Sequence, residues 1–248
     1  MKKSIFLFVL ASLIISTDAY SQRGGGNYGQ SYTSLAGMQL LRTDIIITKD
    51  GDGTKGTPFY NDKFVKGVVY LPNKKTTETL SLALNLEDNH LIYKEGDKFK
   101  IFNPEIIEGI AFQDELGNTE DFFVTGFSSS KNGINKNTAL RVIYNGEIKM
   151  FAHHTVEFDR GNFRDPVTNM KVQEYKKDVD YYIRGENGEF KKTRLRLKNL
   201  VKDIGEFEKE LKDFAKQNKI KGKSESDAFR ILEYYDSLKE DEPNEVRK

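Results

Sequence analysis

The stretch 79-TLSLALNL-86 gives the clearest indication of the fold. Leucine stands at every second position, and threonine, serine, alanine and asparagine stand between the leucines. Because successive side chains of a β-strand point to opposite faces, this pattern predicts a strand with one face on a hydrophobic core. Segments of the same kind, separated by polar turns, recur at 68–71, 90–94, 98–102, 106–112, 121–127, 139–144, 147–151 and 155–158. Residues 39–197 are therefore predicted to form a mainly β domain, an antiparallel meander that packs as a sandwich or curls into a partly open barrel.

The pair Asn145-Gly146 predicts the sharpest turn of this meander. Asparagine and glycine both tolerate positive φ angles, which the two-residue type I′ turn of a β-hairpin requires. That turn fixes the register of the hairpin, so we expect Tyr144 opposite Glu147 and Ile143 opposite Ile148.

The alternating pattern stops at 159–180, which is rich in charge and contains Asp165-Pro166. Since this segment has no sustained apolar period, it is predicted to be a surface excursion from the β domain. A final hairpin is expected over 181–197, where short apolar runs flank Gly185-Glu186-Asn187-Gly188.

The end of the chain changes to a helical period. Apolar residues recur every three or four positions in two groups, Leu200, Ile204, Phe207, Leu211 and Phe214, then Ala228, Ile231, Leu232, Tyr235 and Leu238. Each group makes one apolar stripe of an amphipathic helix. Gly205 interrupts the first stripe, and Ser224 suits the N-cap of the second helix. Residues 198–240 are thus predicted to form a two-helix hairpin, docked on itself or on the sheet, with a frayed end at 241–248.

The first 21 residues predict export. Two lysines precede an apolar run of about 11 residues, which small residues close, and this is the layout of a secretory signal peptide at 1–21. The run is too short for a membrane span of about 20 residues, and no second long apolar segment follows, so no transmembrane segment is expected in the mature chain. The glycine-rich stretch 22–38 is predicted to be a flexible leader. The absence of cysteine excludes disulfides, thiolate metal sites and a lipidated cysteine. We expect a periplasmic or secreted protein.

No motif predicts a catalytic, cofactor or metal site. Asp50-Gly51-Asp52-Gly53-Thr54 lacks the glutamate that a calcium-binding loop needs at its twelfth position. His153 and His154 would point to opposite faces of a strand, so they cannot easily share a metal ion, and His90 lies in a separate turn. The serines lack a nucleophile elbow, and no glycine-rich loop has the context that binds phosphate. No site residue is named and no cofactor is expected.

The segment Lys191–Lys223 holds 12 basic and 5 acidic residues. Two interpretations stay open: a surface for an anionic partner such as phospholipid or lipopolysaccharide, and a solvated helix face whose lysines pair with nearby carboxylates. The glycine-rich leader carries a single arginine, so nucleic acid is not expected as a partner.

Several segments of the chain carry a resemblance to known sequences. They are 56-GTPFYNDKFVKG-67, 84-LNLEDN-89, the first amphipathic stripe of the tail and 234-YYDSL-238. Together they resemble a family of uncharacterised exported proteins of Bacteroidota-type bacteria. The resemblance implies export and a β-rich body with a helical C-terminus, and it supplies no activity and no functional residue.

These observations favour an exported cell-envelope protein that is a non-catalytic binding or interaction module. Its expected partner is another envelope protein or a glycan. The alternative is a periplasmic hydrolase of glycans or peptides whose two carboxylates come from separate strands, about 5–9.5 Å apart in a cleft. A third hypothesis is a protein that binds a lipid surface through Lys191–Lys223.

Overall fold

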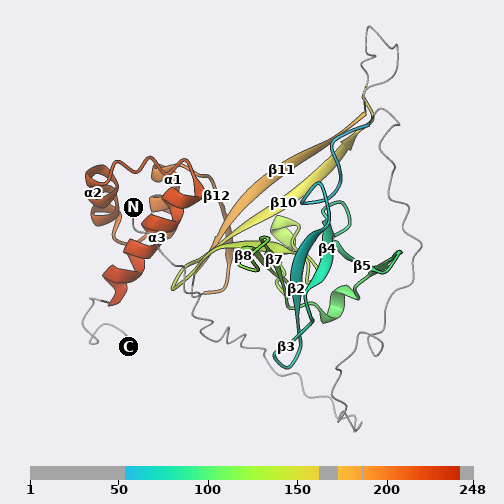
Figure 1. The fold of residues 1–248 in the computed structure, drawn as a ribbon. Coiled ribbons are helices and arrows are strands. Elements are labelled where there is room, and N and C mark those ends of the chain that lie inside the picture. Colours follow the sequence, from blue (N-terminus) through green and yellow to red (C-terminus); the bar gives the residue numbers. More distant parts are fainter. Residues whose placement is uncertain (1–53, 162–172, 186, 241–248) are drawn as a thin grey trace. The chain divides into compact units, whose positions relative to one another are not determined.

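The computed structural model describes residues 54–161, 173–185 and 187–240, which all belong to the second of two units of the chain, Met38–Lys248. The predicted signal peptide at 1–21, the leader at 22–38, most of the Asp50–Thr54 turn and the tail at 241–248 lie outside the described residues. The strands are β1 (Thr54–Lys55), β2 (Val65–Leu71), β3 (Lys75–Thr76), β4 (Leu80–Asn85), β5 (His90–Glu95), β6 (Lys98–Ile101), β7 (Gly109–Gln113), β8 (Thr119–Val124), β9 (Leu140–Asn145), β10 (Lys149–Asp159), β11 (Gln173–Arg184) and β12 (Phe190–Thr193). The helices are α1 (Leu197–Ile204), α2 (Glu208–Gln217) and α3 (Glu225–Glu240) (Figure 1).

The strands form a single large sheet in the order β1-β11-β10-β9-β8-β7-β2-β4-β5-β6, with β12 on β11 and β3 on β2. All described pairs are antiparallel except β1 with β11, so the sheet is mixed. The prediction of a mainly β body is confirmed, whereas the sheet is not closed and the barrel form of the prediction is not confirmed. The leucine-rich stretch forms β4, and Leu80, Leu82 and Leu84 are buried as its alternation predicts. Ala83, which the alternation places on the opposite face, is also buried, so both faces of the strand are covered at this point.

The predicted surface excursion at 159–180 is wrong over its second part. Residues 173–180 are the first two thirds of β11, and residues 174–180 of them pair with the end of β10 from His153 to Asp159. This ribbon is held by cross-strand side-chain pairs instead of a buried apolar face: the rings of Phe158 and Tyr175 lie 4.7 Å apart, and Lys176 pairs with Asp159 at 2.5 Å. Charged and aromatic cross-strand pairs carry no alternating hydrophobic signal, which is why the sequence pattern missed this part of the strand.

The register predicted at Asn145-Gly146 is also wrong. Tyr144 pairs with Met150 and Asn145 with Lys149, so the three residues 146–148 make the turn. Gly146 does not have the positive φ of a type I′ turn. A Cβ at this position would lie 1.8 Å from Oδ2 of Asp236 on α3. Glycine therefore leaves room here for the carboxylate of Asp236, which a larger residue would displace.

The C-terminal region has three helices, where two were predicted. Gly205 has a φ of +85° and ends α1, with its N–H donating to the carbonyl of Val201. Phe207 is also left-handed, with a φ of +51°, and α2 begins at the next residue. The predicted cap at Ser224 is confirmed, because its Oγ accepts a hydrogen bond from the Asp227 N–H at 3.1 Å.

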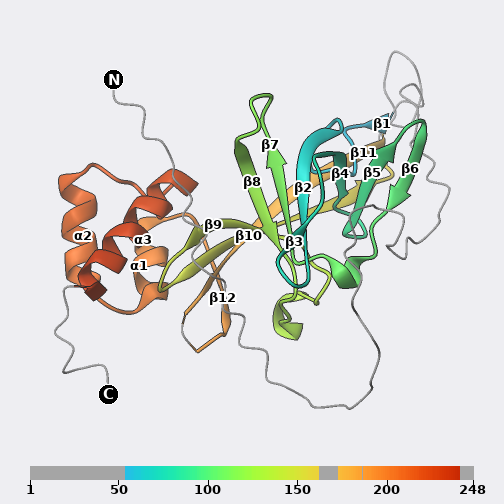
Figure 2. The same cartoon turned by 60° about the horizontal axis from the view of Figure 1, so that its bottom comes forward.

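The helices pack on the end of the sheet formed by β9, β10, β11 and β12 (Figure 2). Their apolar stripes share one core with Ile148 and Met150 from the β10 hairpin and Ile183 from β11. The sequence left open whether the helices pack on each other or on the sheet, and the structure shows that they pack on the sheet. In the part of the chain that the structure describes, no helix is both long and apolar enough to cross a membrane.

Candidate functional site

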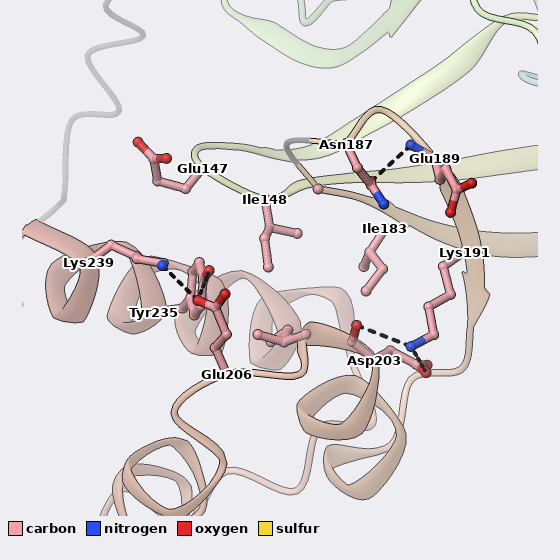
Figure 3. Close-up of a pocket in the computed structure, with 12 residues that line it drawn as sticks. Glu147, Ile148, Ile183, Asn187, Glu189, Lys191, Asp203, Glu206, Tyr235 and Lys239 are labelled. Atoms are coloured by element: carbon pink, nitrogen blue, oxygen red, sulfur yellow. Dashed lines mark hydrogen bonds and ion pairs between the residues drawn. The ribbon is translucent and has the colours of Figure 1, made fainter. Parts of the chain in front are cut away.

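A pocket of about 420 Å³ lies where the turns after β9 and β11 meet α1, α3 and the loop between α1 and α2 (Figure 3). Ile148, Ile183 and Ile204 supply its apolar surface. The first two of these belong to the core shared by helices and sheet, so the base of the pocket is part of the packed interior. The charged residues that line it are Glu147, Glu189, Lys191, Asp203, Glu206 and Lys239.

Two lysine–carboxylate pairs stand on opposite sides of this pocket (Figure 3). Lys191 of β12 pairs with Asp203 at 3.1 Å, and Oγ1 of Thr193 donates to the same carboxylate at 2.7 Å. On the other side, Lys239 of α3 pairs with Glu206 at 2.7 Å, and the hydroxyl of Tyr235 donates to Glu206 at 3.0 Å. The hydrogen bond from Lys239 holds the pKa of Glu206 below its usual range, so this carboxylate is ionised at neutral pH.

Glu147 and Glu189 stand at the rim, one on each hairpin turn (Figure 3). Both residues are exposed, and no ion pair of either appears among the described residues. Four carboxylates and two ammonium groups line the pocket, and both ammonium groups are already paired. The pocket therefore presents a net negative charge to a ligand.

A second polar group, the Arg141 cluster, joins α3 to the sheet. It consists of Tyr60, Asp121, Arg141, His154, Tyr181 and Glu225, which come from the segment before β2, from β8, β9, β10 and β11, and from the first turn of α3. The Arg141 guanidinium donates to Asp121 at 3.3 Å, to Glu225 at 2.5 Å and through Nε to Nε2 of His154 at 3.2 Å. Its side chain is only 15% exposed, so these charges act on one another with little screening by water.

Tyrosine hydroxyls occupy the outer positions of the Arg141 cluster. Tyr60 donates to Asp121 at 2.9 Å, and Tyr181 donates to Glu225 at 3.1 Å. Burial raises the pKa of Tyr181 to about 12 and also raises that of Tyr60, so both remain protonated donors at neutral pH. Burial lowers the pKa of Arg141, but its hydrogen bond to Glu225 and the surrounding negative charge outweigh this effect, and the net shift is upward.

Asp121 and Glu225 are carboxylates from separate elements, as the hydrolase hypothesis requires. However, Arg141 lies between them and donates to both. A glycosidase needs one carboxylic acid that stays protonated and a gap that admits the scissile bond or a water. A guanidinium occupies that gap and donates to both carboxylates, so this arrangement does not match the chemistry of a hydrolase.

The histidines occupy separate surroundings. His153 faces Asp180, Tyr182 and Lys192, whereas His154 on the other face of β10 contacts Arg141 and the ring of Tyr60. His90 lies beside Asp88 at the start of β5. Among the described residues, no group of three or more histidines and carboxylates is placed to hold a metal ion.

The basic segment Lys191–Lys223 is partly neutralised by ion pairs. Besides Lys191 with Asp203, Lys192 pairs with Asp180 at 2.7 Å and Lys212 pairs with Glu208 one helical turn before it. These three pairs agree with the interpretation of a solvated surface whose lysines have carboxylate neighbours.

His154 is expected to make the protein less stable as the pH falls from about 6.5 to about 4. Burial, with a further contribution from Arg141, lowers its pKa from 6.5 to about 4, while Asp121 and Glu225 oppose the shift. Between these values the unfolded chain binds a proton at this histidine and the folded protein does not, so stability declines with falling pH. The loss between pH 7 and pH 5 should be of the order of 2 kcal/mol, measured as the free energy of unfolding in urea.

His154→Gln removes this titration and keeps an acceptor for Nε of Arg141, so its stability should decline less over the same interval. His90→Gln is the matched control, because His90 is partly exposed at the start of β5 next to Asp88, and the stability of this variant should decline like that of the parent protein. An equal decline in His154→Gln would contradict the assignment to His154.

Neither the pocket nor the Arg141 cluster was predicted from the sequence. Their residues are spread over the segment before β2, five strands, two helices, two hairpin turns and the loop between α1 and α2, and each is an ordinary surface or strand residue in its local context. No short-range spacing could have revealed them. Among known proteins, no family model matches this chain, and no curated protein or solved structure is similar to it.

Proposed function

We propose that this protein is a non-catalytic binding module of the bacterial cell envelope, and that its pocket between the hairpin turns and α1 and α3 receives part of another envelope protein. The observation that carries the proposal is the pocket itself. It combines an apolar base, continuous with the packed core, and a polar rim, which is the usual composition of a site that holds a ligand. The export signal predicted at 1–21 and the resemblance to exported proteins support the location.

The lining of the pocket favours binding over catalysis. Its lysines are engaged with Asp203 and Glu206, so neither is available as a nucleophile or proton acceptor. The hydroxyl of Tyr235 is engaged in a hydrogen bond that it donates to Glu206, and the isoleucines offer only apolar surface. What the pocket offers a partner is shape, apolar area and charge.

The helix α3, which forms one wall of the pocket, is attached to the sheet near both of its ends. At its N-terminal end Glu225 binds Arg141, and near its C-terminal end Asp236 accepts a hydrogen bond from the Tyr144 hydroxyl at 2.6 Å. A site whose walls are fixed in this way loses little conformational freedom when it binds, which favours affinity.

Gly185 offers a way to close the pocket without disturbing the fold. A Cβ at this position would meet no atom closer than 3.9 Å, and Gly185 has no positive φ. Gly185→Trp should therefore fold and fill the opening with its indole. A photo-crosslinking amino acid at Asn187, on the pocket wall, should form one defined adduct in intact cells, identified by the partner peptide that mass spectrometry finds attached. Adding Gly185→Trp should reduce that adduct at least tenfold.

Leu116 serves as the control position, because it is 87% exposed in the turn between β7 and β8 and lies outside the pocket. The same crosslinker there should not give the adduct. Equal adducts at both positions, no adduct at Asn187, or an adduct that Gly185→Trp leaves unchanged would each contradict the proposal. If the adduct contains sugar and no peptide, the partner is a glycan and not an envelope protein, which contradicts the proposed partner class.

A further inference from the structure

We infer that the pocket binds a lysine or arginine side chain that projects from the partner polypeptide. This inference rests on the proposed function and adds the chemical class of the group that is held. Three features of the pocket support it: its size, its apolar base and the charge of its rim.

The size suits a side chain. A pocket of about 420 Å³ is at the small end of the range for ligand sites, roughly 300–1,000 Å³, and it takes one or two side chains instead of a folded element. Ile148 and Ile183 point into it from the hairpin side (Figure 3). Ile204, the last residue of α1, also lines it. Such a surface suits the aliphatic stem that lysine and arginine bury while their charged end stays near water.

The rim selects the sign of the ligand's charge. Lys191 and Lys239 are each neutralised by a carboxylate inside the pocket, so an anionic ligand would have to compete with Asp203 and Glu206. Glu147 and Glu189 face no such cation among the described residues, and they leave the opening negative. A cationic end group is therefore attracted to the rim, and its stem covers the isoleucines.

The rim glutamates can be altered without harm to the attachment of α3. Both are exposed, and the backbone N–H of Glu147, not its side chain, is the group that helps to hold Asp236. The double variant Glu147→Gln with Glu189→Gln keeps the shape of the pocket and removes two negative charges. Its matched control is Glu115→Gln with Glu120→Gln, two exposed acids of the β7–β8 hairpin, which changes the net charge equally at a distance from the pocket.

The test measures binding of three acetylated, amidated tripeptides, Leu-Lys-Leu, Leu-Gln-Leu and Leu-Glu-Leu, by heteronuclear NMR titration of the full mature chain at low salt. The lysine peptide should bind most tightly, with shifts at Ile148, Ile183 and Ile204. The rim variant should weaken it about five- to tenfold and reduce its salt dependence, and the control pair should leave its affinity within twofold. Cadaverine, which has the amine without a peptide, should bind several-fold more weakly.

The outcomes separate the inference from the proposed function. If Gly185→Trp leaves the binding of every probe unchanged, the pocket is not the binding site and both fail. If Gly185→Trp abolishes binding of a probe while the rim variant binds the lysine peptide as tightly as the parent, the pocket binds but does not select a cation, and only this inference fails. If the glutamine or glutamate peptide binds as tightly as the lysine peptide, the inference that the pocket prefers a positively charged side chain is wrong. If cadaverine binds as tightly as the lysine peptide, the inference that the cation belongs to a polypeptide is wrong.

Discussion

Arg141→Met is expected to lower the free energy of unfolding by about 2–3 kcal/mol. The variant removes the cation that Asp121 and Glu225 share and leaves two partly buried carboxylates facing each other. Breaking a fully buried ion pair costs about 3–5 kcal/mol, and the 27% and 31% exposure of the two carboxylates reduces that cost. Urea unfolding followed by circular dichroism measures the change. Because Glu225 begins α3, the helices should lose protection from hydrogen exchange before the sheet does.

Two comparisons show whether unpaired charge is the cause. Arg141→Met combined with Asp121→Asn and Glu225→Gln removes the repulsion and should regain at least half of the lost stability. Arg230→Met, at an exposed position of α3 where the guanidinium donates to Oδ1 of Asn218 at 3.4 Å, should change stability by about 0.5 kcal/mol or less. If the triple variant is no more stable than Arg141→Met alone, the loss comes from packing of the arginine stem and not from charge.

Strands of the sheet could be predicted from the sequence wherever burial makes apolar residues recur at a regular spacing along the strand. In β4 the leucines at every second position are buried, and Ala83 between two of them is buried as well, so the leucines of 79–86 alone predict the strand. The same reasoning failed for the ribbon of β10 and β11, whose outer part is stabilised by pairs such as Lys176 with Asp159 across two strands. A pair between strands leaves no period along either of them, so this part of β11 looked like a charged loop.

Gly146 shows a different limit of the sequence. Next to asparagine, a glycine predicts a tight turn, because that is its commonest use. Here glycine leaves room for the side chain of Asp236, which lies 90 positions later in the sequence. The carboxylate of Asp236 occupies the space that a Cβ of residue 146 would take. The Arg141 cluster has the same origin: Arg141 and Glu225 are 84 residues apart and meet only because the helices fold back onto β9 and β11. Sites assembled by packing between distant elements become visible only in the structure.

Gly222→Ala is expected to cost about 3 kcal/mol and to loosen the packing of the three helices. Gly222 lies in the link between α2 and α3 with a φ of +67°, and a Cβ there would lie 2.4 Å from the backbone nitrogen of Leu197 and 2.8 Å from its Cα. The left-handed conformation costs an alanine about 1 kcal/mol, and the clash adds about 1–3 kcal/mol because it involves backbone at the start of α1 and not the end of a side chain. Urea unfolding followed at 222 nm measures the loss.

Gly205→Ala is the matched control for this expectation. Gly205 also has a positive φ, +85°, but a Cβ there would meet no atom within 4 Å. Its replacement should therefore cost only the conformational part, about 1 kcal/mol. The difference in the loss of unfolding free energy between the two variants measures the effect of the close approach of the α2–α3 link to the start of α1. This approach sets the position of α3, and with it the positions of Tyr235 and Lys239 in the pocket wall. If both variants lose the same stability, the link moves away from Leu197 at no cost, and the close approach does not fix the position of α3.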